Sequence, residues 1–476
     1  ISACLVGSEM CIRDRPGPML VVAGAGAGKT ETMAARVVWL VANGFVRPDE
    51  VLGLTFTRKA AQEMGKRIRD RLGALAANTD LLKRLDPAGE LAETLQVIAP
   101  TVSTYDAYAG ELIREYGLLV PVEPDARLIT DAELHAIATD VVLNHAGGLL
   151  SDSGSNPTLN TVVGELLALT TAMGNELTGP DWVTERAHEF IAETESYPPS
   201  PKARVEFTQV LQRWRSKQEE RVNYLALSRA LQAELRRRGV VTFNEQMSVA
   251  AGLARDHAAV GESQRRRFRV VMLDEYQDTS HAQRVLLRSL FGQGTDPELT
   301  VTAVGDPMQA IYGWRGATAA NLEAFVHDFP AASGAPAPKR QLTTSWRNPP
   351  EVLELANGVS GAVLGSGEAR AVEPLAAREG AGPGEVKLGF FPHQEEEIAF
   401  VADELASRYT ASVGAGETFS AAVLVRRNRH SHTVAEALEE RGVPYEIVGL
   451  AGLLDVPEVA DAVAVATMLV LSLIHI

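Results

Sequence analysis

Cysteine is scarce in this sequence of 476 residues, because only Cys4 and Cys11 occur and both lie near its start. The rest of the chain therefore cannot hold a disulfide framework or a thiolate zinc site. Long apolar runs are scarce too: the closing run at 462–476 is shorter than the about 20 residues that a membrane-spanning helix needs. We expect that run to begin a buried helix, and we expect a cytoplasmic protein without a membrane segment.

Positive charge is also in short supply, since 45 Lys and Arg stand against 61 Asp and Glu, a net charge of −16. This balance argues against indiscriminate coating of nucleic acid but is compatible with a local basic groove. Hydrophobic residues at 46% and charged residues at 22% exclude a disordered, collagen-like or coiled-coil chain. At roughly 150 residues per domain, the length predicts about three domains.

The two ends of the sequence differ from the rest. The first fifteen residues, ISACLVGSEMCIRDR, have no clear helix or strand period and lack the features of a signal peptide. They resemble translated sequencing-adapter read-through, and so does the closing SLIHI. We expect a non-native leader at 1–15 and a non-native tail at 472–476; the alternative is that these ends are real but uninformative.

Short apolar, β-branched runs alternate with helical patterns along much of the chain. Such alternation predicts an α/β fold with a parallel sheet that helices cover on both faces. Five runs are expected as buried strands: MLVVAG (19–24), VLGLTFT (51–57), TVSTY (101–105), VVMLDE (270–275) and VTAVGD (301–306).

The pattern changes between the third and fourth expected strands, where residues 107–240 have helical periodicity. The tail of this region, 202–238, carries ten Lys and Arg against four Asp and Glu. This excess indicates either a surface that faces a polyanion or solvated helix faces. A stretch rich in Ala, Pro and Gly at 331–338 then predicts a domain boundary.

A second α/β unit is expected beyond this boundary. Its expected strands are 387–391, 421–427 and 445–449, and its expected helices start at about Pro350, near 395 and at 432. The whole division is a leader (1–15), a first domain in two parts (16–106 and 241–330) around a helical insertion (107–240), a linker (331–340), a partial second domain (341–471) and a tail (472–476).

The sequence AGAGAGKT (23–30) follows an expected strand and precedes an expected helix. Glycines let backbone N–H groups approach phosphates closely, and the helix N-terminus favours negative charge. Lys29 can reach the β- and γ-phosphates, and the Thr30 hydroxyl can hold Mg²⁺. The alternative is a glycine-rich turn without a ligand. The predicted nucleotide-binding residues are Ala23, Gly24, Ala25, Gly26, Ala27, Gly28, Lys29 and Thr30.

Two further segments carry chemical groups after expected strands. Asp274 can hold Mg²⁺ and Glu275 can polarise an attacking water, although an Asp-Glu pair can also be an ordinary solvated strand end. In GDPMQAIYGWRGA (305–317), Gln309 could contact a γ-phosphate or its water. Tyr312 and Trp314 could stack on bases and Arg315 could add charge, whereas the alternative for Trp314 is a half-buried packing role.

These segments, together with TFTRKAAQEM (55–64) and SWRNP (345–349), carry a family resemblance. The chain resembles superfamily 1 DNA helicases of the UvrD/Rep/PcrA type from about residue 16 to about residue 470, with the five motifs in family order. Its details are similar to actinobacterial members, including helicase subunits of helicase–nuclease machines. The resemblance implies RecA-like P-loop NTPase domains with parallel sheets and a helical insertion.

The resemblance also implies roles at the nucleotide. Lys29 and Thr30 would bind ATP and Mg²⁺, Asp274 would hold the metal and Glu275 would be the general base. Gln309 would couple the γ-phosphate to DNA. Arg347 would approach the γ-phosphate across a cleft between domains, and Trp346 would stack on adenine.

For single-stranded DNA, the resemblance implies a stacking wedge at Trp314 and contacts from two further segments. The alternatives are core packing for Phe56, a solvated charge for Arg58 and ordinary strand-end polar residues for 103–105. The DNA-binding residues implied or predicted are Phe56, Thr57, Arg58, Ser103, Thr104, Tyr105, Tyr312, Trp314 and Arg315.

Four departures from the family pattern qualify the resemblance. The place of the adenine-reading Gln motif holds no Gln, and Glu31 stands where an Arg often packs on adenine. Residues 241–248 are less acidic than in many members, and the sequence stops before the last two motifs. We therefore expect this chain to bind nucleotide weakly and hydrolyse it poorly, while a full-length parent is active.

The leading hypothesis is an ATP-dependent DNA helicase that acts in repair or recombination and moves along single-stranded DNA, 3′ to 5′ by family resemblance. Its cofactors would be ATP and Mg²⁺. Its partners would be single-stranded and duplex DNA, and a nuclease or repair protein is a possible further partner. The alternatives are a helicase subunit of a helicase–nuclease complex, a nucleotide-switched DNA-binding ATPase that does not translocate, and a different P-loop ATPase such as a kinase or transporter subunit.

Overall fold

A computed structural model describes most of the chain. The described residues are 9–14, 16–86, 89, 91, 94–95, 98–120, 123, 125–145, 157–196, 205–292, 296–364, 372–448 and 457–475. Contacts divide the chain into two units, Ile1–Gly384 and Glu385–Ile476.

The centre of the first unit is a parallel sheet of six strands in the order β3-β2-β6-β7-β1-β8. All five strands expected from the sequence form, and the α/β fold with a parallel sheet is confirmed. Apolar, β-branched runs suit strands buried on both faces. The strands are β1 (Met19–Ala23), β2 (Val51–Thr55), β3 (Thr101–Thr104), β6 (Val270–Leu273), β7 (Thr300–Gly305) and β8 (Lys339–Leu342).

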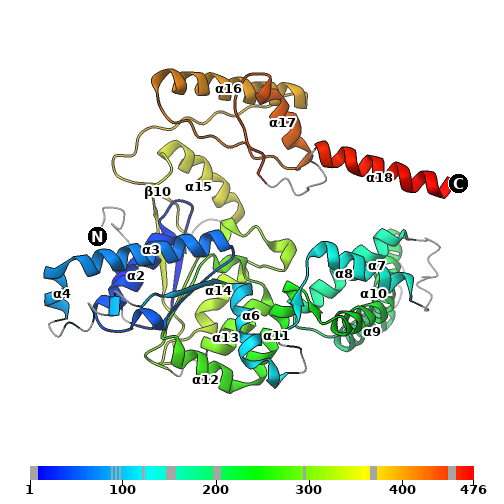
Figure 1. Ribbon diagram of the computed structural model, residues 1–476, viewed down its shortest axis with the longest axis horizontal. Helices are drawn as coiled ribbons and strands as arrows, with labels where there is room; N and C mark the ends of the chain where they lie inside the picture. The colour runs from blue at the N-terminus through cyan, green and yellow to red at the C-terminus, as the bar shows by residue number, and fades with distance from the viewer. Residues whose placement is uncertain are drawn as a thin grey trace. The chain divides into compact units, whose positions relative to one another are not determined.

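Helices cover both faces of the sheet (Figure 1). Because side chains alternate along a strand, Leu20 and Val22 of β1 join the hydrophobic core on one face, and Met19 and Val21 join the core on the other. On the face of Met19 lie α2 (Lys29–Ala42) and α3 (Arg58–Ala77). On the face of Leu20 lie α6 (Tyr105–Tyr116), α11 (Phe243–Asp256), α12 (Ala258–Arg267), α13 (His281–Phe291) and α14 (Ala320–Asp328).

The helical insertion forms a bundle with its own hydrophobic core (Figure 1). Leu166, Leu227 and Leu231 are fully buried there. The bundle is anchored to α11, because the amide of Asn244 donates to the Thr171 carbonyl and the Ser248 hydroxyl donates to the Gly174 carbonyl. Its elements are β4 (Arg127–Leu128), α7 (Asp131–Leu143), α8 (Leu159–Asn175), α9 (Pro180–Ser196), α10 (Val205–Arg237) and β5 (Val240–Val241).

Several described basic residues of the stretch 202–238 contact groups within this bundle. Arg229 pairs with Asp181, and Glu234 pairs with both Arg237 and Arg238. These ion pairs favour the interpretation as solvated helix faces over a surface dedicated to a polyanion.

The segment expected as a linker, 331–340, ends inside the sheet. Its last residues belong to β8, which pairs with β1 in parallel. The chain continues through β9 (Thr344–Ser345), α15 (Pro350–Leu364) and β10 (Ala376–Ala377), which pairs with β9. The helix expected from Pro350 is therefore present.

The second unit contains α16 (Gln394–Ala415), α17 (Arg429–Glu439) and α18 (Pro457–His475). The strands expected at 387–391, 421–427 and 445–449 do not form in its described residues, so that prediction was wrong. Extended runs become strands only when neighbouring strands accept their hydrogen bonds, and here Leu388, Phe390 and Leu424 are 85–100% exposed.

The closing apolar run is helical but not buried as expected, because the described side chains at 461–469 are exposed. No packing surface within the described part of the chain covers them. None of the described helices is both long and apolar enough to span a membrane.

Short elements complete the fold. At the start of the described chain, Cys11 and Ile12 are buried, and the Arg36 guanidinium of α2 donates to the carbonyls of Cys11 and Asp14. Residues 1–8 of the expected leader lie outside the described residues. The remaining elements are α1 (Glu9–Arg13), α4 (Thr79–Leu85), η2 (Pro48–Glu50), η3 (Gly117–Leu119), η4 (Tyr276–Asp278), η5 (Pro307–Gln309) and η6 (Gly313–Arg315).

Candidate functional site

The loop between β1 and α2 has the backbone of a phosphate cradle. Gly26 and Gly28 have φ of 77° and 85°, a left-handed conformation that side chains other than glycine rarely adopt. The N-terminus of α2 carries no side-chain cap. Its first N–H groups are thus available to an anion, and the helix dipole favours one.

Lys29 and Glu275 meet at the carboxyl end of the sheet. Lys29 Nζ lies 3.0 Å from Glu275 Oε2, and their side chains are 12% and 34% exposed. Glu275 itself has φ 49° and ψ 43°, so a non-glycine residue is held in the left-handed region at the site. A left-handed backbone conformation is strained for a residue other than glycine, and it persists only where the surrounding structure imposes it.

Asp274 lies beside this pair and is buried. Burial and the neighbouring Glu275 carboxylate raise the pKa of Asp274 to about 6, against the lowering effect of Lys29. A buried carboxylate next to a second one provides a favourable place for a cation.

The oxygen atoms that the protein offers at this site suit Mg²⁺ that binds together with a nucleotide. In the described part of the chain there is no group of three or more His, Cys, Asp or Glu that could hold a metal by itself. Mg²⁺ is usually bound through one or two carboxylates plus substrate phosphates. Asp274 and the Thr30 hydroxyl would supply protein oxygens of this kind.

The segment 345–347 lies directly on the phosphate loop. The Trp346 backbone N–H donates to the Gly26 carbonyl over 2.9 Å, and the Ser345 hydroxyl donates to the Ala25 carbonyl over 3.2 Å. A Cβ on Gly26 would lie 2.8 Å from Arg347 Cβ, so only glycine fits there. The backbone of Trp346 and the Cβ of Arg347 thus lie at the loop, and the stacking on adenine and the γ-phosphate contact implied by the resemblance stay predictions.

The residues predicted to contact bases form an aromatic cluster at the same edge of the sheet. Phe56 and Tyr312 are stacked with ring centroids 6.1 Å apart, and Tyr312 lies 6.3 Å from Trp314. The Arg315 guanidinium lies 4.7 Å from the centroid of the Trp314 ring. Trp314 is 73% exposed, so its ring is available to a ligand.

Other predicted DNA contacts have structural partners. The hydroxyls of Thr57 and Thr104 cap the N-termini of α3 and α6 by accepting from the N–H groups of Ala60 and Ala107. Tyr105 is buried beneath Phe56, and its hydroxyl donates to the Asp274 carbonyl. Within these segments Thr57 and Arg58 are exposed, and Ser103 is half-buried.

Comparison with known families identifies the architecture. Residues 9–330 match the model of the UvrD/REP helicase N-terminal domain, and residues 341–471 match that of the UvrD-like helicase C-terminal domain. The chain belongs to the UvrD/REP helicase family.

Individual relatives agree with this family. The chain is 28% identical to ATP-dependent DNA helicase UvrD1 of Mycobacterium leprae, covering 94% of this chain and 50% of the relative. It is 26% identical to ATP-dependent DNA helicase PcrA of Leuconostoc citreum (96% and 51%) and 28% identical to ATP-dependent DNA helicase UvrD2 of Mycobacterium bovis (94% and 55%). The chain spans about half the length of these curated relatives.

Three polar residues of the site were missed by sequence reasoning. Gln277, Asp278 and Asp306 are buried and connect the segments described above. The signal was present in the sequence, because polar residues within five positions of the ends of two buried strands need hydrogen-bond partners if they are buried. Their partners come from segments distant in sequence, which a single sequence does not reveal.

Gln309 is bonded to one of these residues. Its amide Nε2 donates to Asp306 Oδ2 over 2.6 Å. The residue predicted to couple a γ-phosphate to DNA is therefore held at the end of β7 by the residue that directly follows this strand.

Glu31 stands where an Arg often packs on adenine in this family, and here it has a structural role. It pairs with Arg67 at 3.5 Å and also with Arg71. Both arginines belong to α3, so Glu31 joins α2 to α3 at the side of the phosphate loop.

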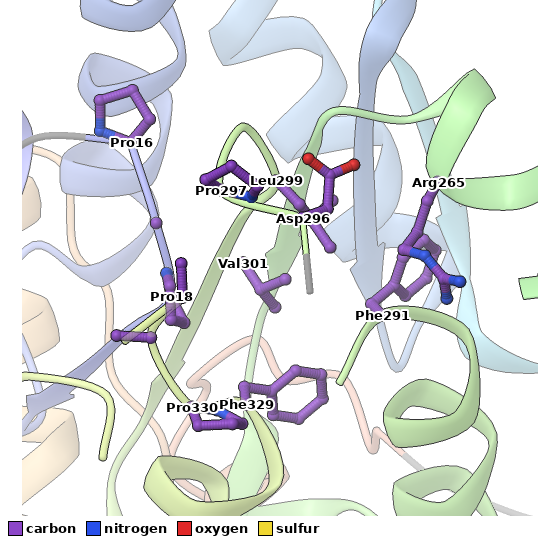
Figure 2. A pocket seen from close by; sticks show the side chains of 13 residues that line it. Pro16, Pro18, Arg265, Phe291, Asp296, Pro297, Leu299, Val301, Phe329 and Pro330 are labelled. Carbon is purple, nitrogen blue, oxygen red and sulfur yellow. The ribbon is translucent and has the colours of Figure 1, made fainter. Parts of the chain in front are cut away.

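A separate cavity lies away from the phosphate loop, at the amino ends of β1 and β7. It has a volume of about 100 Å³ and is walled by prolines and by Phe291, Phe329 and Arg265 (Figure 2). None of the predicted site residues lines it, so it takes no part in the arrangement described above.

Proposed function

We propose that this chain provides the ATP-hydrolysing and DNA-binding part of an ATP-dependent DNA helicase. The observation that carries the proposal is the placement of two groups at one edge of one sheet. The Lys29–Glu275 pair lies at the end of the phosphate loop, and the aromatic cluster of Phe56, Tyr312 and Trp314 lies beside it.

At the nucleotide, Lys29 would exchange its partner Glu275 for the β- and γ-phosphates, which leaves the carboxylate free to accept a proton from the attacking water. The residues that would hold Mg²⁺ are Thr30 and Asp274. When bound, Mg²⁺ supplies charge neutralisation at the phosphates. Arg347 would add positive charge at the γ-phosphate, and the Trp346 ring would pack on the base.

At the DNA, exposed aromatic rings would grip single strands without reading their sequence. Changes at the γ-phosphate would reach these rings through the segment 305–316, which includes Gln309. Repeated closing and opening around ATP would move the strand past Trp314. Movement 3′ to 5′, a role in repair or recombination and a cytoplasmic location are parts of this proposal that rest on family membership.

The test is ATP hydrolysis with and without single-stranded DNA. The wild-type protein is expected to hydrolyse ATP faster when an oligonucleotide is present. Glu275→Gln is expected to keep ATP binding and to lower turnover by at least about 10²-fold, because general base catalysis contributes 10²–10⁴-fold. Turnover at the wild-type rate in this variant would remove Glu275 as the base.

The alternatives predict different results in three assays: the response of ATP hydrolysis to DNA, the unwinding of a duplex and the binding of a nuclease. A nucleotide-switched DNA-binding ATPase would bind ATP and DNA without unwinding a duplex. The presence of both Lys29 and Glu275 argues against a protein that has lost ATP hydrolysis. A helicase subunit of a helicase–nuclease complex would unwind DNA and also bind a nuclease. A P-loop ATPase of another class would not respond to DNA.

A further inference from the structure

Gln277 is a buried side chain that touches both sides of the site. It is 1% exposed and belongs to η4, the turn that follows the two carboxylates. Its amide Nε2 donates to Glu275 Oε2 over 2.9 Å, and its Oε1 accepts from the Asp306 backbone N–H over 3.0 Å. One side chain therefore joins the candidate general base to the first residue after β7.

The orientation of this amide is determined by its partners. A backbone N–H can only donate, and an ionised carboxylate can only accept. The oxygen of Gln277 must therefore face Asp306, and its nitrogen must face Glu275. The reverse orientation would leave the buried Asp306 N–H without its acceptor, and an unpaired buried donor costs about 1–3 kcal/mol.

Asp278 continues the connection to the aromatic cluster. Its Oδ1 accepts from the backbone N–H groups of Ile311 and Tyr312 at 3.1 and 3.4 Å. Its Oδ2 accepts from Gln277 Nε2 at 3.3 Å. The residue whose ring stacks on Phe56 is thus tied through two side chains to the carboxylate that pairs with Lys29.

The packing around Gln277 leaves little freedom. A Cβ on Gly305 would lie 2.6 Å from Gln277 Oε1, closer than two such atoms can approach. Because packed interiors shift between discrete arrangements rather than deforming continuously, a movement of the Gln277 amide must be followed by Gly305 and Asp306.

We propose that Gln277 and Asp278 couple the nucleotide site to the aromatic cluster, with Gln277 as the positioning residue between Glu275 and the segment 306–312. The inference rests on the proposed function. Lys29 and Gln277 share one oxygen of Glu275, at 3.0 and 2.9 Å. When Lys29 turns to phosphate, Gln277 becomes the remaining side-chain donor to that oxygen, and the hydrogen bonds to Asp306 and Asp278 carry the adjustment to Tyr312.

The test measures how far bound nucleotide changes the affinity for single-stranded DNA. The affinity of the chain for a fluorescently labelled oligothymidine is determined without nucleotide and with a non-hydrolysable ATP analogue plus Mg²⁺. The wild-type ratio of the two dissociation constants is expected to differ from one by at least about 5-fold, the lower end of typical coupling between sites. In Gln277→Leu the ratio is expected to fall within about 2-fold of one.

Two further variants make the result specific. Gln264→Leu is the matched control, because Gln264 is also 1% exposed and accepts from the Tyr108 hydroxyl on α6; its ratio is expected to equal the wild-type ratio. Gly305→Ala leaves Gln277 in place but displaces its amide, and it is expected to reduce the ratio as Gln277→Leu does. If Gln277→Leu does not fold, Gly305→Ala decides.

The outcomes separate this inference from the proposed function. A wild-type ratio in both Gln277→Leu and Gly305→Ala would overturn the inference and leave the helicase proposal intact. The same holds if the wild-type protein binds both ligands with a ratio of one. Failure of the wild-type protein to bind nucleotide or single-stranded DNA at all would overturn the proposed function, and the inference with it.

Discussion

Trp314 is the side chain of the aromatic cluster that is most available to a ligand, with 73% of its surface exposed. Stacking of one base on an aromatic ring contributes about 1–3 kcal/mol. We therefore expect Trp314→Ala to weaken binding of a labelled oligonucleotide by about 5- to 150-fold, measured by fluorescence anisotropy. The matched control is Trp182→Ala, because Trp182 is 53% exposed on α9 of the insertion. An equal loss in both variants would contradict a specific role for Trp314.

The buried Asp274 carboxylate is proposed to bind Mg²⁺, but its ionised form lowers the stability of the fold. Its pKa is raised from 3.8 to about 6 by burial and by Glu275. Between these values the folded state binds more protons than the unfolded state, so stability falls as pH rises through this window, and the loss is complete above it. Removing the charge therefore stabilises the protein at neutral pH.

We expect Asp274→Asn to raise the free energy of unfolding by about 1–3 kcal/mol at pH 7.5 and by less at pH 5. The measurement is urea denaturation without nucleotide at the two pH values. The same variant should lose ATP turnover, because it removes a carboxylate proposed to hold Mg²⁺. A stability gain of the same size at both pH values would contradict this account of Asp274.

At the scale of elements, α3 and α6 are each preceded by a threonine that the sequence predicts as a DNA contact, Thr57 and Thr104. The structure gives both hydroxyls a capping role, and a cap of this kind stabilises a helix by about 1 kcal/mol. Capping and DNA contact are separable at Thr57, because aspartate is an equally good cap but repels phosphate.

We expect Thr57→Ala to lower the free energy of unfolding by about 1 kcal/mol and Thr57→Asp to preserve it while weakening binding of single-stranded DNA. Thr242, which caps α11 by accepting from the Glu245 N–H, is the control. Thr242→Asp should preserve both stability and DNA binding. Equal DNA affinity in Thr57→Asp and the wild-type protein would place Thr57 outside the DNA contact.

The strands show which secondary structure could be predicted from the sequence and which could not. The five expected strands of the first unit were predictable because each is a run rich in apolar and β-branched residues whose neighbours lie in the same unit, whereas β8 (Lys339–Leu342) is no such run and was not predicted. The equally apolar runs at 387–391 and 421–427 were predicted as strands but form none. A strand needs a partner for its hydrogen bonds, and pairing is a property of the tertiary structure rather than of the run itself.

At the scale of the whole molecule, the proposed ATP site is assembled within one unit from segments far apart in sequence. The phosphate loop follows β1, the carboxylates follow β6, and Trp346 follows β9, all before the division at Gly384. The parallel strands β1 and β6 bring their carboxyl ends to one edge of a sheet, and Trp346 reaches the phosphate loop through its backbone hydrogen bond to Gly26.

The sequence by itself determined the strand–helix alternation, the phosphate loop, the paired carboxylates and the family resemblance, because each depends on residues within a few positions of one another. Only the tertiary structure decided that Tyr105 is buried beneath Phe56, that β8 closes the sheet beside β1, and that Gln277 joins Glu275 to Asp306. The physical reason is that burial and buried hydrogen bonds are satisfied between segments whose proximity depends on the packing of the whole sheet.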